Sequence, residues 1–209
     1  MLAFLSKQNG NSLVELMIAM TLGLASITAM ASLVGHGIAL NSSLLATSRL
    51  EEEMNAVVTV ISHDLKRAGY FSNTKEMVED PKTISNPFDN SVIVAAFGNE
   101  PINSCINFAY DRNKNGILDT GNGNENYGYR LRNKAIEIRL DGALCDQSGW
   151  HDLTDSKIVE VKELHFGLQQ MSIQQVKHTK VNIELFATLK KHPNISRRVN
   201  TSVLIENYE

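Results

Sequence analysis

Residues 16–40 read LMIAMTLGLASITAMASLVGHGIAL, and this stretch decides the fold. No Asp, Glu, Lys or Arg lies between Glu15 and Arg49, and a composition rich in Leu, Met, Ala and Ile favours a helix over a strand. The run is longer than the ~20 residues that a helix needs to cross a bilayer. The sequence therefore predicts one apolar helix of membrane-spanning length near the N-terminus, with His36 as its only ionisable side chain.

Glu15 stands immediately before the apolar run, and three interpretations of this N-terminus treat it differently. A secretory signal peptide has an apolar region of ~7–15 residues, which is shorter than this run. A signal anchor fits the length, but it leaves unexplained an acid at the start of a membrane segment, where a carboxylate is costly and usually functional. The third interpretation depends on the residues that precede the run.

Residues 7–20, KQNGNSLVELMIAM, resemble the processing site of type IV prepilins. The resemblance implies that a prepilin peptidase cuts after Gly10 on the cytoplasmic side and that Asn11 becomes the N-methylated first residue. The apolar helix stays on the product. Most members of the family begin with phenylalanine, so Asn11 departs from the pattern. Glu15 becomes the fifth mature residue, where the family keeps a glutamate.

The position of Glu15 suggests a role in assembly. A buried carboxylate needs a partner, and the free amine of a neighbouring mature N-terminus would supply one when such helices pack into a pilus. Under this hypothesis the pair sets the axial register of the filament. The alternative is that Glu15 only reaches the lipid head groups at the membrane edge. Lys or Arg flanks a membrane segment more often than Glu does, which favours the assembly role.

The helix is expected to continue beyond the apolar run as an amphipathic segment. Its apolar stripe, at spacings of three and four, consists of Leu50, Met54, Val57, Ile61 and Leu65. Residues 61–71, ISHDLKRAGYF, resemble the end of the long helix in PilW-type minor pilins, where a similar D-L/I-R/K-x-A-G-Y string recurs. Gly69 is the expected helix stop.

The remainder of the chain follows a period of two, which predicts strands. The candidates are residues 91–97, 105–110, 126–132, 135–140, 158–168, 181–190 and 195–205, with a hairpin turn at Asn133-Lys134. They predict an antiparallel sheet with one face on the long helix, an α+β arrangement of the type IV pilin kind. Residues 72–90 are expected to form a loop.

The expected organisation has three parts. Residues 1–10 are the leader, and residues 11–70 are the long helix with a transmembrane segment at about 16–40. Residues 71–209 are the periplasmic β-rich domain.

Cys105 and Cys145 are the only cysteines, and both lie outside the membrane segment. If Lys7 stays in the cytoplasm, the domain lies in the oxidising periplasm, where a disulfide is favoured over two unpaired thiols. In the chain-entropy model such a bridge contributes ~3–4 kcal/mol to stability.

Residues 111–119, DRNKNGILD, match the start of a calcium loop, D-x-[DN]-x-[DN]-G. The candidate ligands are Asp111, Asn113, Asn115, Ile117 and Asp119. Position twelve holds Asn122 instead of a bidentate glutamate, so we expect modest affinity. The alternative is a flexible loop rich in Asn and Gly. A pilin requires no cofactor, and calcium is the only candidate.

Charge and motifs argue against several classes of function. The net charge of −3 argues against coating nucleic acid through bulk charge. A basic C-terminal region could contact DNA or an anionic surface, although a solvated sheet rim explains it better. Its members are Lys177, His178, Lys180, Lys190, Lys191, His192, Arg197 and Arg198. GxSxG, HExxH, P-loop and dinucleotide motifs are missing, so we do not expect an enzyme.

These features predict a minor pilin of a type IV pilus. The resemblance implies processing by prepilin peptidase, insertion as a single-pass inner-membrane protein, and final location in the pilus at the cell surface. It also implies assembly with other minor pilins, the major pilin and the inner-membrane machinery, in a complex that starts the filament. A place at the tip would link the subunit to motility, adhesion or DNA uptake.

Two alternatives stay open. A type II secretion pseudopilin of the J type would share the leader, helix and sheet. A tip-located module would bind DNA or a surface ligand.

Overall fold

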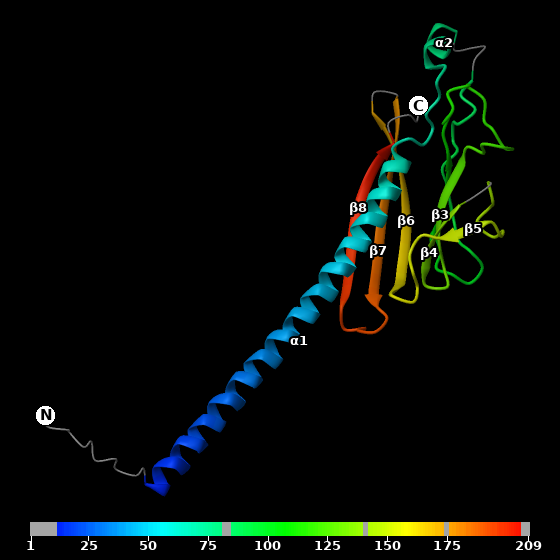
Figure 1. The fold of residues 1–209 in the computed structure, drawn as a ribbon. Helices are drawn as coiled ribbons and strands as arrows, with labels where there is room; N and C mark the ends of the chain where they lie inside the picture. The colour runs from blue at the N-terminus through cyan, green and yellow to red at the C-terminus, as the bar shows by residue number, and fades with distance from the viewer. Residues whose placement is uncertain (1–11, 81–84, 140–141, 174–175, 206–209) are drawn as a thin grey trace, which may run out of the picture. The chain divides into compact units, whose positions relative to one another are not determined.

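The computed structural model describes residues 12–80, 85–139, 142–173 and 176–205 of the chain (Figure 1). They belong to two compact units, Met1–Leu45 and Ala46–Glu209. Helix α1, Leu13–Leu65, provides the described part of the first unit and enters the second. The second unit adds a short helix, α2, Thr74–Glu79, and two antiparallel sheets.

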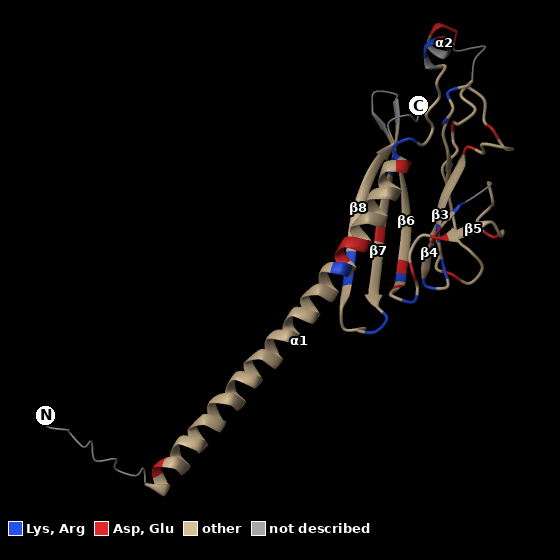
Figure 2. Cartoon of the chain, viewed as in Figure 1, with Lys and Arg blue, Asp and Glu red and all other residues tan. Residues whose placement is uncertain are grey.

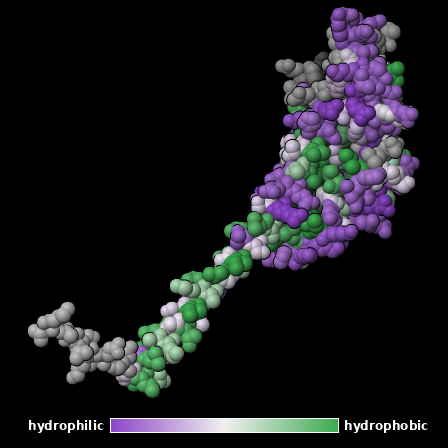
Figure 3. Space-filling view, in the orientation of Figure 1, coloured by the Kyte–Doolittle hydropathy of each residue, from purple (hydrophilic) through white to green (hydrophobic). Residues whose placement is uncertain are grey.

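The first unit is an apolar helix. Every described residue up to Leu45 is exposed in the isolated subunit, and hydrophobic side chains cover most of its surface (Figure 3). Within the described chain, α1 is the one helix long and apolar enough to cross a membrane. The helix begins after Ser12, whose carbonyl accepts hydrogen bonds from the amides of Glu15 and Leu16 at 2.9 and 3.2 Å.

The second part of α1 packs on the sheets through the predicted stripe. Its buried residues are Leu50, Met54, Val57, Val58, Ile61 and Leu65. The helix ends at Leu65, before the expected limit at residue 70. The cause is Gly69, which has a φ of 76° and donates its amide to the carbonyl of Ala109 at 2.9 Å. This bond to sheet residues turns the chain away from the helical path, and glycine tolerates the left-handed conformation.

The strands form two antiparallel sheets, where a single sheet was predicted. Sheet A has the order β1-β2-β3-β4-β5, with β1 Ile93–Ala95, β2 Cys105–Ala109, β3 Asn126–Arg132, β4 Ala135–Arg139 and β5 Trp150–Asp152. Sheet B has the order β6-β7-β8, with β6 Val159–Ile173, β7 Val176–Leu189 and β8 Ser196–Ile205.

The two sheets meet through separate backbone bonds. The amide of Val161 on β6 donates to the carbonyl of Lys134, and the amide of Phe166 donates to the carbonyl of Asn103. Both acceptors lie in connections of sheet A, so no continuous ladder forms between the sheets. This explains why one predicted sheet is divided into two.

The structure confirms one predicted turn and adds two short elements that the sequence did not predict. The hairpin turn at Asn133-Lys134 is confirmed, and both residues have the positive φ of a type I′ turn, 49° and 66°. Helix α2 lies within residues 72–90, where only a loop was expected, and β5 was not predicted.

One hydrophobic core joins α1 to both sheets. The inward residues of β7 are all buried, as the alternation predicts: Val181, Ile183, Leu185, Ala187 and Leu189. Sheet A contributes Phe108, Tyr129, Leu131 and Ile136. The α+β fold expected from the sequence is confirmed.

Candidate functional site

The predicted processing site adjoins the start of α1. Gly10 and Asn11 lie outside the described residues, so cleavage and methylation stay predictions. Glu15 lies exposed in the first helical turn. An acid suits this place because the helix N-terminus has partial positive charge. Its role in assembly register also stays a prediction.

Four polar side chains of the apolar helix are bonded within the helix. Three hydroxyls donate to backbone carbonyls at 2.8–2.9 Å: Thr21 to Ile18, Ser26 to Leu22 and Thr28 to Ala25. His36 Nδ1 lies 2.8 Å from the carbonyl oxygen of Ser32. These bonds satisfy polar groups where water is scarce, so the helix suits lipid or the packed centre of a filament.

The segment that resembles PilW-type minor pilins docks on sheet A. The Tyr129 hydroxyl donates to the Asp64 carboxylate at 2.5 Å. Burial, and next this bond, raise the pKa of Tyr129 above its usual value. The Arg67 guanidinium lies 4.1 Å from the ring centroid of Tyr110. The end of α1 is therefore fixed to sheet A by specific side chains.

Cys105 and Cys145 form a disulfide, as predicted, with their Cα atoms 6.2 Å apart. Both residues are buried, and the side-chain amide of Asn107 donates to Cys145 Sγ at 3.2 Å. The bridge ties residues 142–149, which we call the β4–β5 segment, to strand β2.

A buried arginine was missed in the sequence. Arg130 on β3 is fully buried, and its Nε lies 2.6 Å from Glu137 Oε2 on β4. Its Nη1 donates to the carbonyls of Cys145 and Gln147 at 2.6 and 2.9 Å. Arg130 therefore binds the same segment that the disulfide holds.

Two aromatic rings enclose the guanidinium of Arg130. Its Cζ lies 4.5 Å from the centroids of both Phe97 and Trp150, within cation–π distance. In the sequence, Arg130 stands between the apolar residues Tyr129 and Leu131. This alternation is typical of a strand residue that faces solvent. No local signal marks it as buried.

The predicted calcium loop is held together by carboxylates that accept backbone amides. Asp111 is 1% exposed and accepts from the amides of Ser72, Asn115 and Gly116 at 3.0–3.2 Å. Burial acts to raise the pKa of Asp111, but hydrogen bonds, chiefly from Ser72 and Gly116, outweigh it and hold the pKa below its usual value. Gly116 has a φ of 72°, the turn that the motif requires.

The other motif residues lie around Asp119. Asn113 and Asn115 both donate their side-chain amides to Asp119 Oδ2, at 2.7 and 3.0 Å. The side chain of Ile117 is exposed. The buried carboxylate of Glu125 accepts the amide of Asp119 at 3.2 Å. Among the described residues, no group of three His, Cys, Asp or Glu is arranged to hold a metal ion. Calcium binding therefore stays a prediction.

Calcium should bind this loop weakly, with a Kd of ~0.1–1 mM, because few formal charges would face the ion. The Asp119→Asn variant should weaken binding about tenfold, while the exposed control Asp146→Asn should not change it. Isothermal titration calorimetry with calcium, on the full chain in detergent, measures the Kd of the wild type and of both variants. Equal affinity in wild type and Asp119→Asn would contradict this site.

The basic C-terminal region is spread over sheet B. Residues 190–192 follow the end of β7, whereas His178 and Lys180 lie near its beginning. Arg197 pairs with Glu51 at 3.1 Å and Arg198 with Glu163 at 2.7 Å. The side chain of Lys177 lies outside the described part of the chain. This distribution does not favour a single DNA-binding patch.

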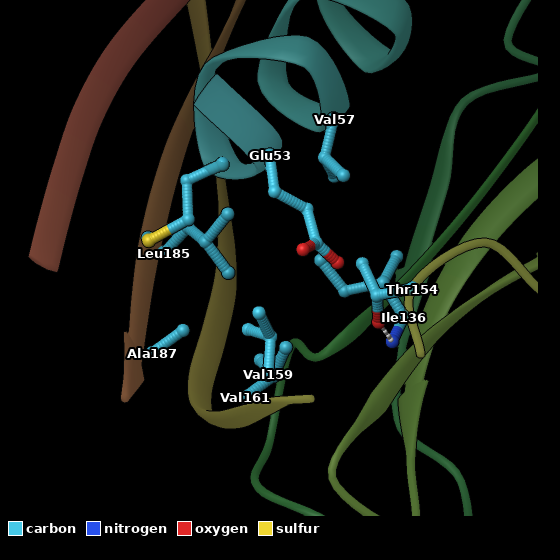
Figure 4. A pocket seen from close by; sticks show the side chains of 9 residues that line it. Glu53, Val57, Ile136, Thr154, Val159, Val161, Leu185 and Ala187 are labelled. Atoms are coloured by element: carbon cyan, nitrogen blue, oxygen red, sulfur yellow. Dashed lines mark hydrogen bonds between the residues drawn. The ribbon is translucent and has the colours of Figure 1, made fainter. Parts of the chain in front are cut away.

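A small hollow lies between α1 and the two sheets (Figure 4). Its lining residues are Glu53, Met54, Val57, Ile136, Thr154, Val159, Val161, Leu185 and Ala187. Burial raises the pKa of the Glu53 carboxyl, against the opposing charge of Arg49. The Thr154 hydroxyl accepts the amide of Ile136 at 2.9 Å. Glu53 is the one ionisable residue in this lining, so the hollow offers no acid–base pair.

Comparison with known proteins places these features in a family. Residues 5–31 match the prokaryotic N-terminal methylation motif. Residues 43–205 match the family of prepilin peptidase-dependent protein B. An uncharacterised protein of Haemophilus influenzae is 24% identical over 201 residues, covering 78% of this chain and 82% of that protein. No solved structure matches the chain. With its apolar helix and antiparallel sheets, the chain is a type IV pilin-like protein that belongs to the prepilin peptidase-dependent protein B family.

Proposed function

We propose that this chain is a minor pilin of a type IV pilus, of the PilW type. The observation that carries the proposal is the prepilin motif around Gly10 and Glu15, joined to an apolar helix on a pilin-like fold. Dependence on prepilin peptidase implies contact with that enzyme and with the pilus machinery. The role is structural, in agreement with the character of pilin-like families.

The apolar helix has two successive environments in this proposal. Before assembly it anchors the subunit in the inner membrane, with the second unit in the periplasm. In the filament it packs against other pilin helices, where Glu15 binds the free amine of a neighbouring mature N-terminus. Both environments are apolar, which suits a helix exposed on all sides up to Leu45. The Cys105–Cys145 disulfide agrees with an oxidising compartment.

The contacts made by residues 61–71, the string that resembles PilW-type minor pilins, support the PilW-type assignment. Asp64 accepts the Tyr129 hydroxyl, Arg67 covers the Tyr110 ring, and Gly69 donates to the backbone of β2. Each of these residues belongs to the string that resembles PilW-type minor pilins, so the string has a structural purpose at the helix–sheet junction.

A J-type pseudopilin of type II secretion is the second candidate, because it would share the leader, helix and sheet. Its partners would be other secretion pseudopilins, whereas a PilW-type subunit would associate with the minor pilins that start a pilus. A tip module for DNA or surface ligands is less well supported, since Arg197 and Arg198 pair with acids.

Partner capture from the native membrane tests this proposal. The tagged full chain should co-purify with type IV minor pilins, and Glu15→Gln should lower their recovery about tenfold, because the partner amine would be left unpaired in an apolar bundle. Glu52→Gln, an exposed position further along α1, is the matched control and should not change recovery. Mass spectrometry of the captured proteins and of the chain's own N-terminus provides the readout.

Three outcomes would contradict parts of this proposal. Recovery of secretion pseudopilins in place of minor pilins would establish the second candidate. Unchanged recovery with Glu15→Gln would show that Glu15 does not set assembly contacts. Wild-type protein that still begins at Met1 would refute processing as a prepilin.

A further inference from the structure

At one end of the second unit, three turns lie near Ala46, the first residue of that unit. We call this region the Ala46 end. It consists of residues 46–53 of α1 and of the turns at residues 133–134, 155–158 and 190–194. The pair between Glu51 and Arg197 places the start of β8 beside this part of α1. The amide of Lys190 donates to the carbonyl of Ile158 at 2.9 Å. The carbonyl of Lys134 accepts the amide of Val161, so all three turns belong to this end.

Basic residues, drawn in blue in Figure 2, predominate on these three turns. The turns carry Lys134, Lys157, Lys190 and Lys191 against a single acid, Asp155. The Asp155 carboxylate accepts the amide of Lys157 at 2.8 Å, which holds it against its own turn. Between Lys190 and Ile205 the sequence contains no acid at all. The ends of the turns are therefore positively charged.

Several acids near the Ala46 end have partners or face inward. Glu51 pairs with Arg197, and Glu53 lies against the hollow. Glu52 is exposed and accepts the Ser48 hydroxyl at 3.3 Å. Glu160 binds Lys134 and Lys162, which lower its pKa to about 2. In the described part of the chain, no carboxylate lies within ion-pair distance of Lys157, Lys190 or Lys191. These three exposed lysines are free to bind another surface.

Chain connectivity keeps Ala46, the first residue of the second unit, close to the apolar run. Five residues, 41–45, lie between the end of the apolar run at Leu40 and Ala46, so the two residues are six steps apart along the chain. Six steps span about 9 Å as a helix and about 20 Å if fully extended, and this limits how far Ala46 can lie from the apolar run. This argument rests on the proposed membrane anchoring of the precursor.

We propose that the lysines of the Ala46 end bind the anionic head groups of the bilayer while the subunit is anchored in the membrane before assembly. The partner is an anionic lipid surface, recognised by charge and not by a pocket. A lysine near such a surface favours the bound state about fivefold, and several lysines act together. The contact would hold the second unit against the membrane until assembly removes the helix from the lipid.

Lysine labelling of the full chain in nanodiscs tests the proposal. One set of discs contains phosphatidylcholine alone, and the other also contains phosphatidylglycerol. An amine-reactive reagent, read by mass spectrometry, should label Lys157, Lys190 and Lys191 about fivefold less in the anionic discs. Lys75 and Lys114, exposed and outside the Ala46 end, serve as internal references. High salt should remove the difference, because it screens charges at the surface.

Variants make the test specific. The Lys190→Glu/Lys191→Glu variant should lose the protection of Lys157, whereas Lys75→Glu/Lys114→Glu should keep it. Equal labelling in both lipids would overturn the inference, as would protection that appears only when another pilin is added to the discs. Insertion without protection would contradict this inference alone. Failure of the chain to insert would contradict the membrane anchoring in the proposed function as well.

Discussion

The Gly10→Val variant is expected to retain residues 1–10 and to be absent from pili, while the wild-type chain begins at Asn11. Valine places a branched side chain beside the peptide bond that the peptidase must cut, where the prepilin motif has only a hydrogen. Without the cut, Asn11 has no free amine to methylate or to offer to the Glu15 carboxylate of a neighbour. Intact-mass and N-terminal peptide mass spectrometry on protein from the native membrane measures both the cut and an added methyl group.

Gly23→Val is the matched control for this experiment. Gly23 lies in the apolar helix, and a Cβ added there meets no atom within 4 Å, so valine should leave processing unchanged. Loss of cleavage in both variants would show that the helix, and not Gly10, governs recognition. Normal cleavage of Gly10→Val would contradict the predicted site. A wild-type chain that begins at Met1 would leave Glu15 as an acid beside a membrane segment without explanation.

The parts of the fold that follow a regular period could be predicted from the sequence. The stripe from Leu50 to Leu65 is buried because spacings of three and four place those residues on one face of a helix. The alternation in β7 is equally reliable, since one face of sheet B covers the core. In both segments the pattern directly reflects which side meets water.

The division into two sheets could not be predicted in this way. It depends on β6 bonding to the carbonyls of Lys134 and Asn103, which are contacts between segments distant in sequence. Gly69 was expected to stop the helix, but its contact with the sheet, through the amide that bonds to Ala109, could not be predicted for the same reason. Neither partner is visible from local periodicity.

The burial of Arg130 could not be predicted for a different reason. Alternation on β3 assigns Tyr129 and Leu131 to the core and Arg130 to solvent, yet all three are buried. The second face of the strand is covered because the disulfide and Arg130 itself bind the β4–β5 segment over it. A strand covered on both faces departs from simple alternation, and the cover here comes from a distant segment.

Removing Arg130 should therefore cost more stability than any surface change. Arg130→Met keeps an unbranched side chain between Phe97 and Trp150, but it leaves Glu137 buried without a counter-charge. It also removes the donor to the carbonyls of Cys145 and Gln147. Breaking a buried ion pair in this way costs about 3–5 kcal/mol, and for a domain of this size the Tm should fall by about 10 °C or more.

Comparison of variants separates the charge effect from the loss of packing. Arg132→Met removes a half-exposed arginine that lies on the same Phe97 ring, 4.7 Å from its centroid, and should cost less than about 1 kcal/mol. Arg130→Met/Glu137→Leu should recover part of the loss, since it removes the uncompensated charge. Thermal unfolding of the full chain in detergent, followed by circular dichroism and by the single Trp150, gives the three values. If the double variant were no more stable than Arg130→Met, the bonds to the β4–β5 segment, and not the ion pair, would account for the stability that Arg130 provides.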